Sequence, residues 1–410
     1  MKHLASTCSI LPLLLCAAGA AQAQDSWGDQ LSRAVTEGKA SVDFRYRYEN
    51  VDQDGFDDDA DASTLRSRLT LETAPLNGFT ALLEVDDVSS IGVDDYNSTE
   101  NGKGEYPVVA DPEGTDVNQA WLKYTGTGFD GTYGRQRILH GSQRFIGGVG
   151  WRQNEQTYDG FRAHWSPIEI LTVDASYVYN VNRIFGPDDG ANPSDLEGDN
   201  YFLRADYKIT PDHTISAFGY LLDFDSQNGY AAGKTVNNSS DTYGVEYQGK
   251  FDWFSVALSW ADQSDAGDSQ LDYDAQYYLV ELGATFQAVN VTVGYEVLGT
   301  GDGVGFSTPL ATLHKFQGWA DMFLATPGDG IEDTYLSIGG SAGPVNLQAV
   351  YHDFQAEDSN ADFGTELDLV ATWPINKQFS VQAKYAAFDT DNRLRYADTD
   401  KAWVTLQLKL

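Results

Sequence analysis

The sequence predicts an all-β protein, a transmembrane antiparallel β-barrel of about 18 strands. Apolar and polar side chains alternate in stretches of about ten residues from about residue 40 to the end. The first stretch has its apolar members at Val42, Phe44, Tyr46 and Tyr48. Tight connections alternate with long ones, and beyond residue 23 no apolar run approaches the roughly 20 residues that a spanning helix needs. One face of each strand can therefore contact lipid while the other lines a polar lumen.

The first 23 residues have the organisation of a secretory signal peptide. Lys2 precedes an apolar run from Ile10 to Ala18, and Ala21-Gln22-Ala23 has the small-x-small form of a signal peptidase site. We expect residues 1–23 to be removed, 24–39 to form an N-terminal lead-in and 40–410 to form a single barrel. Both cysteines of the chain lie in the removed segment, so we expect neither disulfides nor thiol chemistry.

About 18 segments fit the strand pattern, an even number, as a closed antiparallel barrel needs. They are residues 40–50, 62–74, 79–89, 115–125, 129–137, 157–166, 169–181, 199–209, 212–224, 240–249, 252–262, 273–286, 290–299, 331–341, 344–355, 363–373, 377–389 and 398–410. The last segment keeps its apolar residues on one face up to Leu410, as in the terminal strand that the outer-membrane assembly machinery recognises, although that strand usually ends in Phe.

The connections sort into two kinds. Every second one is a short turn rich in Gly, Pro, Asn and Asp, residues that suit turn backbones. The others are long and polar, and include 90–114, 138–156, 182–198, 225–239 and 300–330. Short periplasmic turns opposite long extracellular loops are typical of a bacterial barrel, whereas a soluble β-sandwich has no reason to sort its connections in this way.

Acidic residues dominate the charge. Without Lys2 the mature chain has 25 basic and 61 acidic side chains, a net charge of −36, which makes nucleic acid a very poor partner. Sorted by strand phase, the predicted lumen holds roughly ten basic and about twelve acidic residues, so most of the excess falls in the loops. We expect a solvated acidic rim that can bind divalent cations loosely, but we expect no specific metal site and no cofactor.

Ten arginines are candidates for lining the pore. The first four alternate on two adjacent strands, the next four lie in and around the third long loop, and the last two project inward from later strands. They are Arg45, Arg47, Arg66 and Arg68; Arg135, Arg137, Arg144 and Arg152; and Arg162 and Arg204. Their guanidinium groups could guide an anionic solute by bidentate hydrogen bonds. Alternatively, they pair with carboxylates of the lumen and give a polar wall without selectivity. The sequence leaves both interpretations open.

Two loop segments resemble those of a known family. The first runs from Gly134 to Ile138 and continues from Arg144 to Gly160, and the second runs from His314 to Leu324. Both are similar to segments of the alginate-export family of outer-membrane porins. The resemblance implies an 18-stranded monomeric barrel with an arginine-rich constriction, and it places Arg135, Arg137, Arg144 and Arg152 near that constriction.

The same segments also predict a plug. Glycines at 147, 148 and 150 permit a tight fold, in which Trp151 would pack against the inner wall. In the second segment, Trp319, Met322, Phe323 and Leu324 form a helix-like apolar cluster expected to pack into or onto the barrel. The plug candidates are Trp151, His314, Trp319, Asp321 and Phe323. We favour a structural plug over a ligand site.

No catalytic constellation is present in the sequence. The five mature histidines are spread over separate strands and loops, without a Gly-x-Ser-x-Gly elbow or a His-Glu-x-x-His pair. We therefore expect a porin, not an enzyme, located in the cell outer membrane in contact with lipid and lipopolysaccharide. Its solutes would be small and polar or anionic, with uronates and oligosaccharides as examples. The alternatives are an exporter of an anionic polysaccharide such as alginate, and a non-conducting structural or adhesion barrel.

Overall fold

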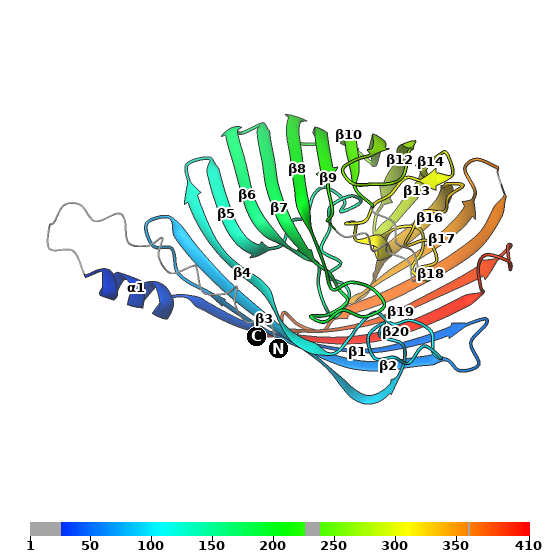
Figure 1. The fold of residues 1–410 in the computed structure, drawn as a ribbon, viewed down its shortest axis with the longest axis horizontal. Coiled ribbons are helices and arrows are strands. Elements are labelled where there is room, and N and C mark those ends of the chain that lie inside the picture. Colours follow the sequence, from blue (N-terminus) through cyan, green and yellow to red (C-terminus); the bar gives the residue numbers. More distant parts are fainter. Residues whose placement is uncertain (1–25, 226–237, 360) are drawn as a thin grey trace.

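Eighteen strands of the described chain form one closed antiparallel sheet (Figure 1). The computed structural model describes residues 26–225, 238–359 and 361–410. The sheet closes because the first strand pairs with both the second and the last. The predicted fold class is confirmed. The predicted signal peptide lies outside the described residues, as does most of the predicted loop 225–239.

Each predicted strand overlaps one observed strand. The observed strands of the barrel are β1 (Lys39–Gln53), β2 (Ala60–Glu72), β3 (Phe79–Asp95), β4 (Gly114–Gly126), β5 (Phe129–Gln136), β6 (Thr157–Ile168), β7 (Leu171–Asn182), β8 (Asp195–Thr210), β9 (His213–Leu222), β10 (Ser240–Phe251), β11 (Phe254–Asp265), β12 (Asp274–Phe286), β13 (Val289–Leu298), β16 (Ile331–Ala342), β17 (Val345–Gln355), β18 (Asp362–Pro374), β19 (Phe379–Thr390) and β20 (Thr399–Lys409). The largest difference is in β3, which continues past the predicted end at residue 89. Its extension, residues 90–95, pairs with β2 across a bulge that shifts the register between Ala62 and Thr64.

The long connections all lie at one end of the barrel. Three of them matter for the interior, and we number them by their order among the extracellular loops: L2 (96–113), L3 (137–156) and L7 (299–330). L7 contains a short hairpin of β14 (Thr300–Gly301) and β15 (Val304–Gly305), and a single 3₁₀ turn, η2 (Leu313–Lys315). The prediction of a helix-like backbone after residue 318 is wrong, because the chain there forms turns. Gln317, Gly318 and Asp321 have φ values of 50°, 80° and 63°, which no α-helix contains.

The lead-in segment contains a helix that the sequence reading did not anticipate. Helix α1 (Trp27–Thr36) starts with a capping box between Ser26 and Asp29. It extends beyond the turn end of the strands (Figure 1), and its end is fixed by a 2.8 Å hydrogen bond from the Ala74 N–H to the Ala34 carbonyl. No helix in the described ranges is both long and apolar enough to cross a membrane.

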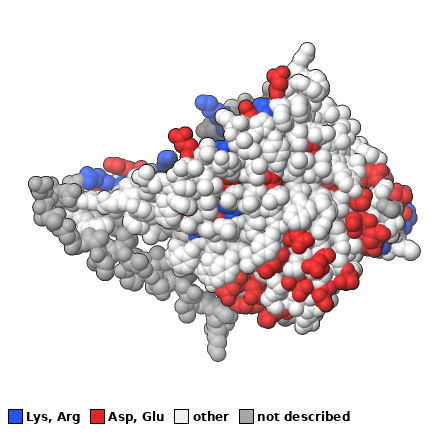
Figure 2. Space-filling model, turned by 90° about the horizontal axis from the view of Figure 1, so that it is seen from above, with Lys and Arg blue, Asp and Glu red and all other residues white. Residues whose placement is uncertain are grey.

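The outer wall is an apolar band. Its exposed side chains come from alternate positions of neighbouring strands and include Leu69, Leu83, Phe161, Leu203, Val245, Leu282, Val293, Ile338 and Leu367. In the face that Figure 2 shows, acidic side chains gather toward the end opposite α1, where the long loops lie. This distribution agrees with an apolar, lipid-facing wall and an acidic extracellular rim.

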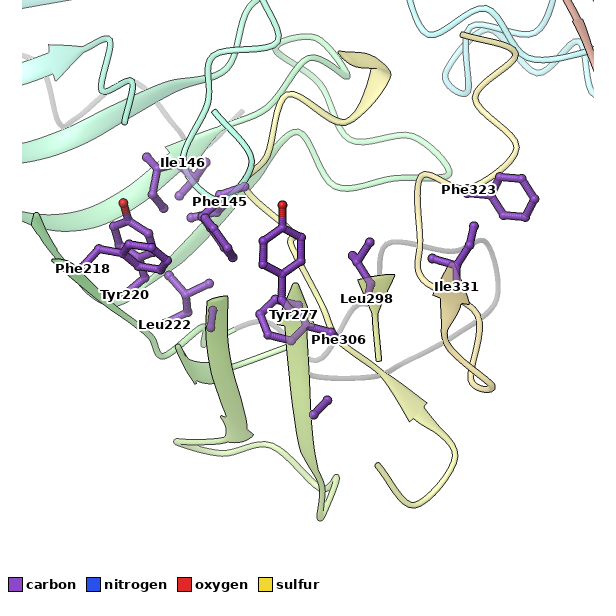
Figure 3. Close-up of a cluster of buried hydrophobic side chains, with 14 of the residues drawn as sticks. Phe145, Ile146, Phe218, Tyr220, Leu222, Tyr277, Leu298, Phe306, Phe323 and Ile331 are labelled. Atoms are coloured by element: carbon purple, nitrogen blue, oxygen red, sulfur yellow. The ribbon is translucent and has the colours of Figure 1, made fainter. Parts of the chain in front are cut away.

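The barrel interior holds a second apolar region. Phe145 and Ile146 of L3 and Phe306 of L7 pack with rings from the inner wall, including Tyr220 of β9 and Tyr277 of β12 (Figure 3). All five side chains are buried. An open polar lumen would not bury apolar rings, so the loops fill part of the barrel.

Candidate pore constriction

L3 and L7 fold into the barrel as one unit. The Gly147 N–H donates to the Leu310 carbonyl at 2.8 Å, and the Thr312 N–H donates to the Gln143 carbonyl at 3.0 Å. A Cβ on Gly147 would lie 2.4 Å from the Thr312 hydroxyl oxygen. This close approach therefore requires glycine at position 147 of the first motif.

The arginines of β1 hold the backbone of L3. Arg45 donates to the Gln153 side chain and the Gly150 carbonyl, both at 2.9 Å, and also to the carbonyl of Arg152. Arg47 donates to the Trp151 carbonyl and lies 3.7 Å from Asp111 of L2. Both side chains are buried. These two guanidinium groups thus position the constriction loop.

The arginines of β2 pair with carboxylates. Arg66 lies 3.3 Å from Asp43. Arg68 donates from its Nε to Asp86 at 2.6 Å and from a terminal nitrogen to Glu155 at 2.9 Å. Pairing with lumen carboxylates is the second of the two interpretations that the sequence left open for these arginines. A role of Arg45, Arg47, Arg66 and Arg68 in guiding anions stays a prediction.

Glu155 of L3 joins two strands of the wall and was not predicted from the sequence. It accepts from Arg137 Nε at 2.7 Å, from Arg68 at 2.9 Å and from the Asn118 amide at 2.8 Å. Burial alone would raise the pKa of Glu155, but the hydrogen bonds and charges of Arg137 and Arg68 outweigh it and lower the pKa to about 2. Glu155 is therefore a carboxylate at any physiological pH.

Arg137 at the start of L3 and Arg162 of β6 keep partly exposed side chains, as does Arg135 of β5 at 24%. The side chains of Arg137 and Arg162 are each 26% exposed, whereas their partners Glu84, Glu155 and Asp174 are 5–9% exposed. Arg162 pairs with Asp174 at 2.6 Å and also donates to the Arg137 carbonyl at 3.3 Å. The carboxylates thus lie behind the two guanidinium groups, and the accessible surface is cationic. We call Arg137 and Arg162 the exposed arginine pair.

The other four candidates make ion pairs inside the barrel. Arg135 contacts Asp159 at 2.9 Å and the 44%-exposed Asp116 at 3.4 Å, so its surroundings are of mixed charge. The remaining three are buried and pair as Arg144 with Glu296 at 3.1 Å, Arg152 with Glu49 at 2.9 Å and Arg204 with Glu246 at 2.7 Å. The structure therefore assigns them internal partners.

The structure brings all five plug candidates into the interior. Trp151 stacks on His314 with ring centroids 3.3 Å apart, and Asp321 accepts from His314 at 2.7 Å. The backbone N–H of Trp319 donates to Asp368 of β18. Phe323 packs with Phe354, Phe363 and Phe388 of strands β17–β19 and with Tyr396 of the loop before β20.

Backbone geometry fixes where L7 meets β18. The Ala320 N–H donates to Glu366 at 2.7 Å, and a Cβ on Gly318 would lie 2.2 Å from Glu366. The left-handed φ of 80° and the approach of this carboxylate both favour glycine at position 318 of the second motif. Within residues 26–225, 238–359 and 361–410, no group of three or more His, Cys, Asp or Glu side chains is arranged to hold a metal ion.

The closed barrel with inward-folded loops has the fold of outer-membrane porins. It is similar to Pseudomonas aeruginosa OccK3 (OpdO), with a TM-score of 0.70, 14% identity and coverage of 94% of this chain and 99% of that one. It is also similar to Acinetobacter baumannii OccAB2, with a TM-score of 0.70, 13% identity and coverage of 92% and 99%. At these identities the likeness shows the fold alone.

The particular family follows from the sequence profile. The profile described as alginate export matches residues 38–305, so the chain belongs to the alginate-export family and is an outer-membrane β-barrel. The match includes the first predicted motif but ends before the second. A comparison with curated proteins found no match.

Proposed function

We propose that the protein is an outer-membrane channel for small anionic or polar solutes, such as uronates and short acidic oligosaccharides. The observation that carries the proposal is the exposed arginine pair, whose guanidinium groups are more accessible than the carboxylates that orient them. A solute carboxylate could accept hydrogen bonds from the exposed N–H groups of Arg137 and Arg162. Membership of the alginate-export family supports an acidic sugar as the chemical class.

The paired carboxylates suit transport as well as recognition. A channel must bind its solute strongly enough to admit it and weakly enough to release it. Glu155 and Asp174 compensate part of the charge of the exposed arginine pair from behind. A bound anion would therefore gain a charge-assisted contact without meeting an uncompensated positive site.

The packed loops favour small solutes over a polymer. L3 and L7 lie inside the barrel and are joined to each other and to its walls. Export of a polysaccharide would require both loops to leave the lumen, so it is the second candidate, supported by the family match alone. We also propose removal of residues 1–23, insertion by the assembly machinery, a monomeric barrel in contact with lipopolysaccharide, and no enzymatic activity.

Uptake into proteoliposomes tests the proposed selectivity. We expect galacturonate to enter faster than galactose, and the double substitution R137Q/R162Q to slow galacturonate roughly tenfold while leaving galactose unchanged. A tenfold change corresponds to the loss of about 1.4 kcal/mol of charge-assisted hydrogen bonding to the solute.

The matched control is R393Q, which removes a positive charge from a 67%-exposed side chain on the extracellular side. It should change neither rate. Equal entry of both sugars into wild-type vesicles would contradict the anion preference, and absence of any uptake would contradict the channel.

A further inference from the structure

A single ammonium group lies among aromatic rings from both constriction loops. Lys384 projects from β19, and its Nζ lies 3.8 Å from the ring centroid of Trp319 in L7 and 5.3 Å from that of Trp151 in L3. A third ring, Trp403 of the neighbouring strand β20, is 5.2 Å away. Lys384 also donates a hydrogen bond to Nε2 of His314 in L7. We call these four aromatic side chains the Lys384 cage.

The rings of the cage also contact one another. Trp151 and His314 are stacked with an interplanar angle of 14°, and both meet Trp403 edge to face at 6.1 Å and 5.8 Å. The cage therefore has one wall from L3, two from L7 and one from the barrel. A cation held over several ring faces is attracted by each of them, most strongly where water is excluded.

A buried polar network fixes the orientation of the cage. Asp321 accepts from Nδ1 of His314 at 2.7 Å and from Lys401 at 3.2 Å, and it lies 3.5 Å from Arg152. Burial lowers the pKa of His314 well below its usual value, so its ring is neutral. A neutral ring with its proton on Nδ1 donates to Asp321 and leaves Nε2 free to accept from Lys384.

We propose that Lys384 is the positioning residue that holds L3 and L7 together in the lumen. This inference rests on the proposed function, because a constriction has meaning only in a channel. Lys384 contacts a ring from each loop, donates to His314 of L7 and belongs to a rigid strand of the barrel. Its loss should release both loops together.

Two readouts on the full mature chain test this role. The first is maleimide labelling of a cysteine at Ala311, a buried L7 position, in a chain whose two natural cysteines lie in the expected signal peptide. We expect K384M to accelerate labelling of A311C about tenfold or more, because the loop opens more often. The second is single-channel conductance in planar bilayers, which should rise in K384M as the loops leave the lumen.

The controls separate position from charge. Q382M changes the next inward-facing side chain of β19, whose amide donates to Thr372 at 3.0 Å, and should alter neither readout. K384R keeps the cation and should restore wild-type labelling and conductance. Adding W319L to K384M should increase labelling by less than the sum of the two single effects, because the contact between them is already lost. Folding of each variant is checked by the heat-modifiable migration of the barrel in gels.

Labelling of A311C that is unchanged by K384M would overturn the role of Lys384, as would an additive effect of W319L and K384M. Faster labelling without current in any variant would instead overturn the channel function while supporting the role of Lys384. The two failures are therefore distinguishable.

Discussion

The two faces of L3 meet the barrel by different physical means. Toward β1–β5, L3 presents carbonyl groups, Gln153 and Glu155 to arginine side chains. Toward β9–β12, it presents Phe145, whose ring lies 4.8–5.9 Å from those of Phe218, Tyr220 and Tyr277. One face is ionic and specific in geometry, and the other is apolar.

The difference separates two tasks. Ion pairs of partly exposed groups contribute little net stability, but they set the charge that a solute meets. Burial of aromatic rings contributes more and needs no particular charge. We infer that the apolar face contributes most of the docking free energy of L3, while the ionic face sets the position of the loop and provides selectivity. Substitutions on the two faces should therefore change different observables.

The largest effect is expected on the apolar face. Phe145→Ala removes a ring that also contacts Phe306 of L7, at a cost of about 3–5 kcal/mol to the docking of the loop. We expect the single-channel conductance to rise several-fold with little change in the preference between anions and cations.

The control for this change is Leu394→Ala, since Leu394 is 99% exposed on the extracellular side. It should leave conductance unaltered. If Phe145→Ala changed the ion preference and not the conductance, the division of tasks between the two faces would be wrong.

On the ionic face we expect a smaller effect, which changes the preference between anions and cations. Glu155→Gln keeps the shape of the side chain and removes the negative charge behind Arg68 and Arg137. A charge about 4 Å away is worth on the order of 1 kcal/mol in water, so the anion preference should rise by up to about fivefold. Reversal potentials in a salt gradient measure this change, and a fall in anion preference would contradict it.

The strands were predictable because a barrel repeats one local rule. Alternation places Arg45 inward and Tyr46 outward whatever the distant chain does, and the turns and loops follow from backbone preferences. Helix α1 was missed because its apolar residues, Trp27, Leu31 and Val35, are few and lie within a segment read as a lead-in. The prediction of a helix-like segment in L7 was wrong because residues with a left-handed backbone conformation, such as Asp321, cannot continue an α-helix.

The site was predictable only in part. The motifs identified the loops that enter the lumen, and strand phase identified inward arginines such as Arg162. Their partners could not be derived, because Glu155 meets Arg68 across 87 residues and His314 meets Lys384 across 70. Which guanidinium groups stay exposed depends on how L3 packs against distant residues, and this packing cannot be predicted from a local sequence pattern.

The most direct test of the proposed anion-preferring channel is the ion preference of single channels in planar bilayers under a potassium chloride gradient. We expect a measurable current in the wild-type protein and a reversal potential that shifts toward cation preference in R137Q/R162Q, because the exposed arginine pair supplies accessible positive charge. A wild-type protein without current, or a reversal potential unchanged by the double substitution, would contradict the proposal.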